Sequence, residues 1–148
     1  NVKNVNVRKM TIEDVKAIYD LSKACFSIPW SFEALTKELS NPLADYQIAE
    51  IDGQIIGYGG LWCVMDEGEI TNIAVDGDYR RQGIGEAILE ALLQIAKQKR
   101  LTIVHLEVRV SNVAAKGLYE KFGFHQIAIR KNYYQQPIED AIIMQYKF

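Results

Sequence analysis

The stretch DYRRQGIGEAILEALLQIAKQKR, residues 78–100, carries the strongest structural signal in this sequence. Ile84, Ile88, Leu92 and Ile95 recur at the spacing of one face of an α-helix. An apolar face of this length must be covered, and a sheet is the natural cover in a chain that also contains strands. The stretch therefore predicts a helix over about residues 83–99 that packs on a sheet.

Two glycines, Gly83 and Gly85, stand where this helix begins. The first turn of a helix has free backbone N–H groups and a partial positive charge. Glycines remove the side chains that would keep an anion away from those groups, so the pattern favours a phosphate or pyrophosphate ligand. Glycine also serves tight turns, and that purely structural explanation stays open here.

Two familiar phosphate-binding loops fit poorly. A Walker A loop needs Lys-Ser or Lys-Thr after its second glycine, where this chain has Glu86 and Ala87. A dinucleotide-binding loop needs a third small residue at the position of Ile88, and it follows its strand directly, whereas a loop of several residues precedes Gly83.

Length and charge limit the remaining possibilities. The 148 residues fit one domain, 1–148, and the net charge of −2 with pI 5.7 argues against a nucleic-acid binder. We see no signal peptide and no apolar run long enough to span a membrane. Cys25 and Cys63 lack metal-ligand spacing and fit a reducing cytosol. We expect buried thiols, no metal, no membrane contact and a cytoplasmic location.

Hydrophobic periodicity and turn residues predict seven strands, at residues 5–9, 46–51, 54–64, 69–75, 102–108, 124–130 and 141–148. Further helices are expected after a Thr11 cap, at residues 31–39 and at 113–122. Gly57, Gly59 and Gly60 suggest a bulge or the close approach of another backbone. A polar, tyrosine-containing loop should join the last two strands. The order is mixed α and β, with hairpins first and strand–helix alternation later.

Arg80-x-x-Gly83-x-Gly85 resembles the Arg/Gln-x-x-Gly-x-Gly/Ala motif of the GNAT acyltransferases, which bind coenzyme A. The blocks NIAVDGDYRRQGIG, HLEVRVSNVAAKGLYEKFGF and RKNYYQQPIEDAIIM resemble the RimI branch, bacterial enzymes that acetylate the N-terminal alanine of a ribosomal protein. The likeness covers the chain from Val5. It implies a single α/β domain with a mostly antiparallel, splayed sheet flanked by helices, acetyl-CoA as co-substrate and a protein N-terminus as partner.

The resemblance also implies which residues hold the cofactor. The acetyl-pantetheine arm would lie against Ile73, Ala74 and Val75, and Asn112 would contact the cofactor. The backbone N–H groups of six consecutive residues would cradle the pyrophosphate: Arg81, Gln82, Gly83, Ile84, Gly85 and Glu86. Many relatives carry Arg or Lys where this chain has Glu86, and we expect this acid to turn toward solvent.

Two catalytic residues follow from the same likeness, Glu107 as proton acceptor and Tyr119 as proton donor to the departing thiolate. From spacing alone, Glu107 could equally form a surface ion pair with Arg109, and Tyr119 could be an ordinary core aromatic residue. Glu69 is a rival base, since some GNAT histone acetyltransferases use a glutamate at the matching position. An N-terminal amine could also react without any single essential base.

Substrate contacts are expected from Trp30, Tyr133 and Tyr134, with Glu139 or Asp140 holding the ammonium group. The alternative is a hydrophobic plug beneath a solvated turn. Two other functions stay open on this fold: acetylation of a lysine or a small-molecule amine, and CoA binding without catalysis. The oligomeric state and the protein target are not predicted.

Overall fold

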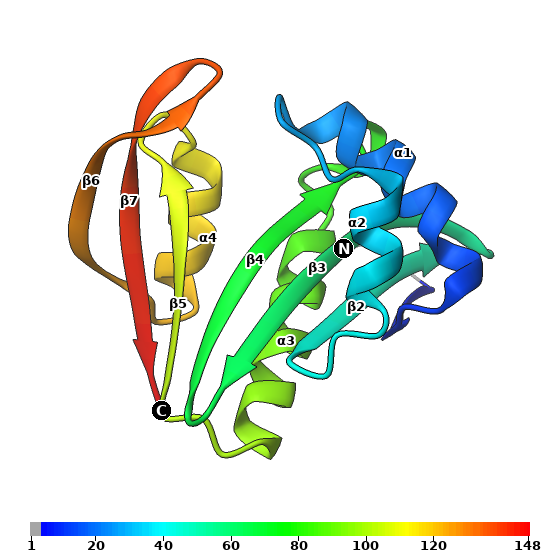
Figure 1. Cartoon of the computed structure of the whole chain (residues 1–148), viewed down its shortest axis with the longest axis horizontal. Helices are drawn as coiled ribbons and strands as arrows, with labels where there is room; N and C mark the ends of the chain where they lie inside the picture. Colours follow the sequence, from blue (N-terminus) through cyan, green and yellow to red (C-terminus); the bar gives the residue numbers. More distant parts are fainter. Residues whose placement is uncertain (1–3) are drawn as a thin grey trace.

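The computed structural model describes residues 4–148 and centres on one seven-stranded sheet in the order β1-β2-β3-β4-β5-β7-β6 (Figure 1). Neighbouring strands run antiparallel, apart from the parallel pair β4–β5. The strands are β1 (Val5–Lys9), β2 (Ala44–Ile51), β3 (Gln54–Val64), β4 (Glu67–Val75), β5 (Ile103–Arg109), β6 (His125–Gln135) and β7 (Ile138–Lys147). The mixed, mostly antiparallel sheet expected from the sequence is confirmed.

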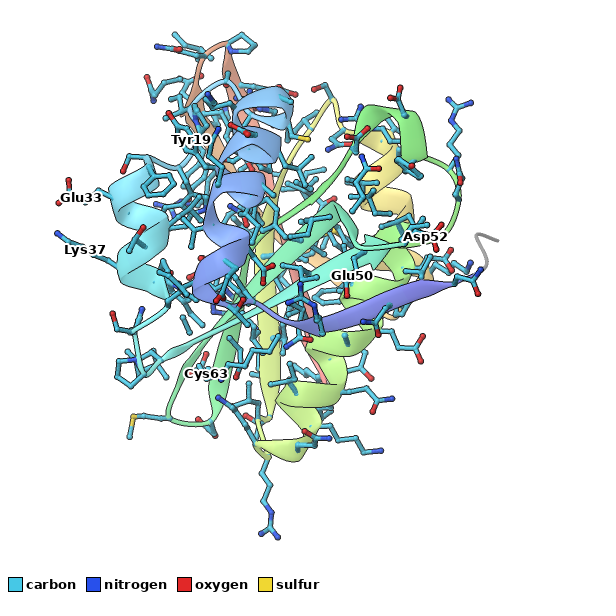
Figure 2. The ribbon with its side chains drawn as sticks, turned by 90° about the vertical axis from the view of Figure 1, so that its right-hand side faces the viewer. Tyr19, Glu33, Lys37, Glu50, Asp52 and Cys63 are labelled. Carbon is cyan, nitrogen blue, oxygen red and sulfur yellow. The ribbon has the colours of Figure 1, made fainter. Side chains whose placement is uncertain are left out.

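Helices cover both faces of the sheet. The helices are α1 (Val15–Cys25), α2 (Phe32–Glu38), α3 (Ile84–Gln98) and α4 (Val113–Lys121), with short 3-10 turns η1 (Ile12–Asp14) and η2 (Gly77–Tyr79). Helices α1 and α2 lie side by side on one face, where Tyr19 of α1 meets Phe32 of α2 edge to face with 5.7 Å between ring centroids (Figure 2). Helices α3 and α4 pack on the opposite face. None of the helices within residues 4–148 is long and apolar enough to cross a membrane.

The glycines of β3 let α3 approach the sheet closely. A Cβ atom on Gly59 would lie 2.6 Å from Cγ2 of Ile88, and one on Gly57 would lie 2.9 Å from Cδ1 of the same residue. Larger residues at these positions would therefore push the helix away. Gly60 lies at a bulge, as the sequence suggested. At Gly57 and Gly59 the approaching atoms are mainly side chains of α3, and at Gly60 they are the side chains of Thr71 and Tyr46 rather than another backbone.

Strands β4 and β5 separate soon after they meet. Their paired positions are Glu67 with Ile103, Gly68 with Val104 and Glu69 with His105. Beyond this last pair the two strands diverge, and Figure 1 shows them opening into a V. The divergence leaves space between the second half of β4 and the second half of β5.

Three sequence-based boundaries were wrong. The turn before β4 lies at Met65 and Asp66, so the strand begins at Glu67 rather than at Glu69. Strand β2 begins at Ala44 rather than at Tyr46, whereas the first helical segment begins after the Thr11 cap as expected, with a 3-10 turn. The polar segment between the last two strands is mostly strand rather than loop: β6 runs to Gln135, and Tyr134 pairs with Glu139 of β7.

The physical reason for the third error lies in the side chains. Tyrosine favours strands, but the polar residues around Tyr133 and Tyr134 are typical of loops, and for this reason the sequence indicated a loop. Tyr134 also gains a stabilising partner that sequence cannot show. The guanidinium of Arg109 lies 4.2 Å from its ring centroid, a cation–π contact from the adjacent part of the sheet.

A buried ion-pair network ties the N-terminal strand to the first helix. Asp14 is 4% exposed and accepts hydrogen bonds from Arg8 at 2.8 and 2.9 Å and from the backbone N–H of Thr11 at 2.7 Å. Arg8 also donates to Glu50 of β2, labelled in Figure 2, at 3.1 Å. The hydrogen bond and charge of Arg8 hold the pKa of Asp14 below its usual range.

Candidate active site

A cavity of about 530 Å³ lies where β4 and β5 separate. Its walls come from the end of α1 and the segment after it, the middle of β4, the end of β5, α4 and the turn-proximal part of β6. The cavity brings together seven of the residues singled out in the sequence: Trp30, Ile73, Glu107, Asn112, Tyr119, Tyr133 and Tyr134.

Glu107 is placed by the alternation of β5. Val104, Leu106 and Val108 are buried in the core with α3 and α4, which turns Glu107 to the opposite face. There its Oε1 accepts a hydrogen bond of 3.2 Å from the Tyr133 hydroxyl. Arg109 pairs instead with Glu139 at 3.1 Å, so it does not neutralise Glu107.

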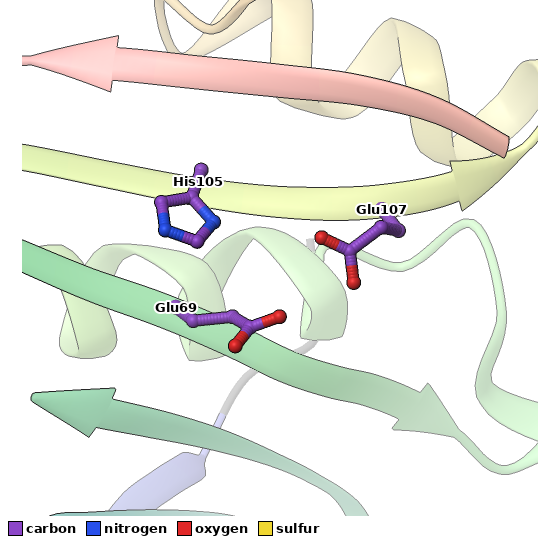
Figure 3. Close-up of side chains that lie close together, drawn as sticks. All are labelled: Glu69, His105 and Glu107. Carbon is purple, nitrogen blue, oxygen red and sulfur yellow. The ribbon is translucent and has the colours of Figure 1, made fainter. Parts of the chain in front are cut away.

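Glu69 and His105 lie next to Glu107, at the last pair before the strands diverge (Figure 3). One ligand-type atom from each of the three side chains lies within 4.8 Å of the others. Burial, followed by the charge of Glu107, raises the pKa of Glu69. The rival base from the sequence therefore adjoins the expected one, although Glu69 does not line the cavity.

Tyr119 reaches the cavity from the inner side of α4. It is 8% exposed, and its ring packs edge to face on Phe124 with 5.8 Å between centroids. Burial alone raises the pKa of Tyr119 to about 12. Ala115, Leu118 and Phe122 face the core from the same helix. A phenol in this position stays protonated and can donate a proton.

The aromatic residues expected to meet substrate line the cavity from two elements, Tyr133 and Tyr134 from β6 and Trp30 from the segment between α1 and α2. The rings of Tyr133 and Tyr134 stand edge to face with centroids 5.0 Å apart, and burial raises the pKa of Tyr134 to about 12. Trp30 stands edge to face with Tyr46 at 6.5 Å, and its buried Nε1 has no hydrogen-bond partner among residues 4–148. An indole N–H of this kind is suited to meeting a ligand carbonyl.

Both acids proposed to hold the ammonium group have structural partners. Glu139 accepts from Arg109 and, at 2.6 Å, from the backbone N–H of Ser111. Asp140 accepts from the backbone N–H of Asn132 at 2.9 Å. Neither residue lines the cavity, so both serve the β6–β7 hairpin and its surroundings.

The glycine motif has the geometry of an anion cradle. Gly83 adopts φ +83° and caps α3, and Arg81 before it also has a positive φ of 63°. The first hydrogen bond of the helix runs from Ala87 N–H to Gly83 O at 3.1 Å. Within the described chain, the N–H groups of residues 83–86 have no acceptor. They point free donors at the helix N-terminus, where a phosphate binds well.

Glu86 does not occupy that cradle. Its carboxylate pairs with Lys121 of α4 at 2.7 Å and remains 44% exposed. The acid that departs from the common pattern therefore turns aside, and its charge is balanced. A Cβ atom on Gly85 would find Leu118 at 3.4 Å, an ordinary contact distance. Packing within the described chain therefore does not by itself require glycine at this position.

The remaining expected cofactor contacts lie at the end of β4 and the start of α4. The side chain of Ala74 is buried, which leaves its backbone to contact a ligand, and the Val75 carbonyl accepts from Cys25 Sγ at 3.5 Å. Asn112 caps α4, with its Oδ1 accepting from the Ala115 N–H at 3.1 Å. Its amide nitrogen is left for other partners.

Sequence reasoning missed several residues of the cavity and its surroundings. Thr71 and Asn72 line it, and each has a buried oxygen without a partner in the described chain. A Thr-Asn pair inside an otherwise apolar strand was a signal that could have been followed. Cys25 also lines the cavity, and both Cys25 and Cys63 are half-buried rather than buried as expected. His105 gave no signal, because one of its two acidic neighbours, Glu69, comes from another strand.

Comparison with known proteins agrees with this geometry. The acetyltransferase (GNAT) family model matches residues 15–124. A Bacillus subtilis (strain 168) protein, provisionally named a ribosomal protein bS18-alanine N-acetyltransferase, is 45% identical over 139 residues, 93% of this chain and 92% of that one.

Two solved structures are also similar to this chain. The ribosomal-protein-S18-alanine N-acetyltransferase of Escherichia coli superimposes with TM-score 0.89 at 34% identity, over 97% of this chain and 93% of that one. A GNAT acetyltransferase of Elizabethkingia anophelis with acetyl-CoA bound gives TM-score 0.82 at 26% identity, over 99% and 100% of the two chains. Fold, family model and relatives agree, and the chain belongs to the acetyltransferase (GNAT) family.

Proposed function

We propose that this protein transfers the acetyl group of acetyl-CoA to the α-amino group of a protein N-terminus, with the alanine of ribosomal protein bS18 as the expected target. The observation that carries the proposal is the meeting of Glu107 and Tyr119 in one cavity at the opening of the sheet. The names of the relatives supply the target. Such a substrate would place the reaction in the cytoplasm, where ribosomes are assembled.

The residues present fit acetyl-CoA. Free N–H groups at residues 83–86 suit its pyrophosphate, and the edge of β4 that faces β5, beyond their last paired position, suits its extended arm. Residues 73–75 lie along that half, and Asn112 stands across the cavity. Bound there, acetyl-CoA supplies a thioester carbonyl that an amine can attack.

Glu107 and Tyr119 then divide the proton transfers. Glu107 is held in place by a hydrogen bond of 3.2 Å from the Tyr133 hydroxyl. From this position it accepts a proton from the attacking amine. Tyr119 keeps its proton until a thiolate departs beside it, because burial raises its pKa to about 12. Trp30, Tyr133 and Tyr134 border the space left for the peptide.

An α-amino group is the easier nucleophile for such a site. Its ordinary pKa is about 7.7–8.0, against about 10.4 for lysine. At pH 7.5, deprotonation costs less than about 1 kcal/mol for the former and about 4 kcal/mol for the latter. A single half-buried carboxylate such as Glu107 is therefore sufficient for an N-terminus.

The test is an acetylation assay with acetyl-CoA and a panel of hexapeptides that differ in their first residue, with the bS18 N-terminus included. A matched peptide with a blocked N-terminus and an internal lysine serves as control. We expect transfer to a free N-terminal alanine or serine and none to the control. Acetylation of the blocked peptide would assign the enzyme to the lysine or small-amine class, and no transfer to any peptide would reject the proposal.

A further inference from the structure

The vertex of the V between β4 and β5 holds an unusual set of side chains. Glu69 and His105 form the last pair of the parallel ladder, and Glu107 is the next residue of β5 on the same face. Figure 3 shows the two carboxylates and the imidazole directed toward one another. All three residues are half-buried.

No side chain among residues 4–148 forms an ion pair that balances the two acids. Among the ion pairs of residues 4–148, none involves Glu69 or Glu107. Arg109, the nearest arginine along β5, is engaged by Glu139 at 3.1 Å. Two half-buried carboxylates that face each other without a positive partner make a site that attracts a cation.

The imidazole decides which cation fits. Mg²⁺ and Ca²⁺ prefer sites made of oxygen ligands alone, whereas an imidazole nitrogen with carboxylates suits Zn²⁺. One ligand atom from each side chain lies within 4.8 Å of the others. Zinc bonds of about 2.0–2.2 Å would draw the ligands to roughly 3.5 Å apart, which rotation of the two glutamate side chains can supply.

We propose that Glu69, His105 and Glu107 form a binding site for one Zn²⁺ ion, and that the ion inhibits the enzyme. Glu107 would offer the metal one oxygen while Tyr133 holds the other by its hydrogen bond of 3.2 Å, an outer contact that orients the ligand. The cavity beside Glu107 leaves the fourth position open to water.

The inhibitory part rests on the proposed function. Glu107 must have a free lone pair to accept the amine proton, and a bound Zn²⁺ ion occupies it. The metal also places positive charge where the ammonium form of a substrate would arrive. Zinc binding itself needs neither substrate nor turnover, so it can be measured separately.

The binding experiment is a titration of the protein with ZnCl₂ by calorimetry, in a Cys25→Ser, Cys63→Ser background that removes both thiols. We expect one ion per chain, and a loss of affinity of about tenfold or more in His105→Gln. The matched control is His125→Gln, because His125 is the second of the two histidines and lies exposed on β6. No saturable binding, equal loss in the control, or full affinity in His105→Gln would overturn the site.

The activity experiment separates this proposal from the proposed function. Zn²⁺ should inhibit peptide acetylation by the parent protein, and His105→Gln should keep its turnover and become insensitive. Mg²⁺ at the same concentration should have no effect. Zinc that binds without inhibiting would overturn the inhibitory part. If the metal-free protein transfers no acetyl group, the proposed function is rejected. The calorimetric titration then decides by itself whether the zinc site exists.

Discussion

Replacing Tyr119 by Phe removes one hydroxyl and leaves the rest of the site in place. The ring is 8% exposed and keeps its contact with Phe124 at 5.8 Å. Among residues 4–148 the hydroxyl makes no hydrogen bond that the substitution would remove, and burial raises its pKa. The free energy of unfolding should therefore change by less than about 0.5 kcal/mol.

The catalytic loss should be much larger. Removing a general acid typically costs a factor of about 10²–10⁴, which corresponds to about 2.7–5.5 kcal/mol of activation free energy. We expect kcat to fall by that factor, with acetyl-CoA affinity unchanged within about threefold. Steady-state kinetics with an N-terminal alanine peptide measure kcat, and calorimetry measures the affinity for acetyl-CoA.

A matched control comes from Tyr146, whose ring lies on the other side of Phe124 at 5.5 Å and does not line the cavity. Tyr146→Phe should keep full turnover. The pH profile gives a second check: with a pKa of about 12, Tyr119 should stay protonated, and the rate should not fall as pH passes 10, the ordinary tyrosine value. Full activity in Tyr119→Phe would refute its role as acid and make it a core aromatic residue.

Three further changes test the rest of the structure. Glu107→Gln should fold normally and lose roughly 10²-fold in turnover, while Glu69→Gln should lose much less; the reverse order in a kinetic comparison would transfer the base to Glu69. Gly85→Val should weaken acetyl-CoA binding by about tenfold or more, because its side chain fills the anion cradle, and unchanged calorimetric affinity would contradict the cradle. Asp14→Asn should destabilise the protein by about 1–3 kcal/mol at pH 7, since Arg8 loses one of its two acidic partners and keeps only Glu50. The pKa of Asp14 is lowered by folding, so this stabilisation is present above its ordinary value of 3.8 and is lost as pH falls through the folded value; urea unfolding at pH 7 and pH 3 should show the variant's deficit shrinking.

Sequence predicted the parts of the fold that depend on local periodicity. The helix at residues 84–98 and the strand at 54–64 appear where apolar spacing and turn residues placed them. The two last strands were predicted, but the part of the hairpin near its turn was missed, because its strand character depends on pairing between Tyr134 and Glu139 and on the distant Arg109. Contacts of this kind have no fixed spacing in a sequence.

The candidate site also has features that could be predicted from the sequence and features that became visible only in the structure. Resemblance to a family marked Glu107 and Tyr119, and the structure brings both to one cavity. Tyr133 was expected to meet substrate, and its hydrogen bond to Glu107 became visible only in three dimensions. The gathering of Glu69 and His105 beside Glu107 depends on where two strands stop pairing, which residue spacing does not encode.

The divergence of β4 and β5 also gives the protein two strand edges that face inward. Exposed edges recruit strands from other molecules and promote aggregation, so proteins usually cover them. Here the two edges flank the cavity, and an extended ligand arm or peptide end can complete their hydrogen bonding as an added strand. Edges that would promote aggregation in most sheets are here suited to binding an extended ligand. Ligand binding should therefore slow amide exchange along residues 70–75 and 107–109 more than elsewhere in the sheet.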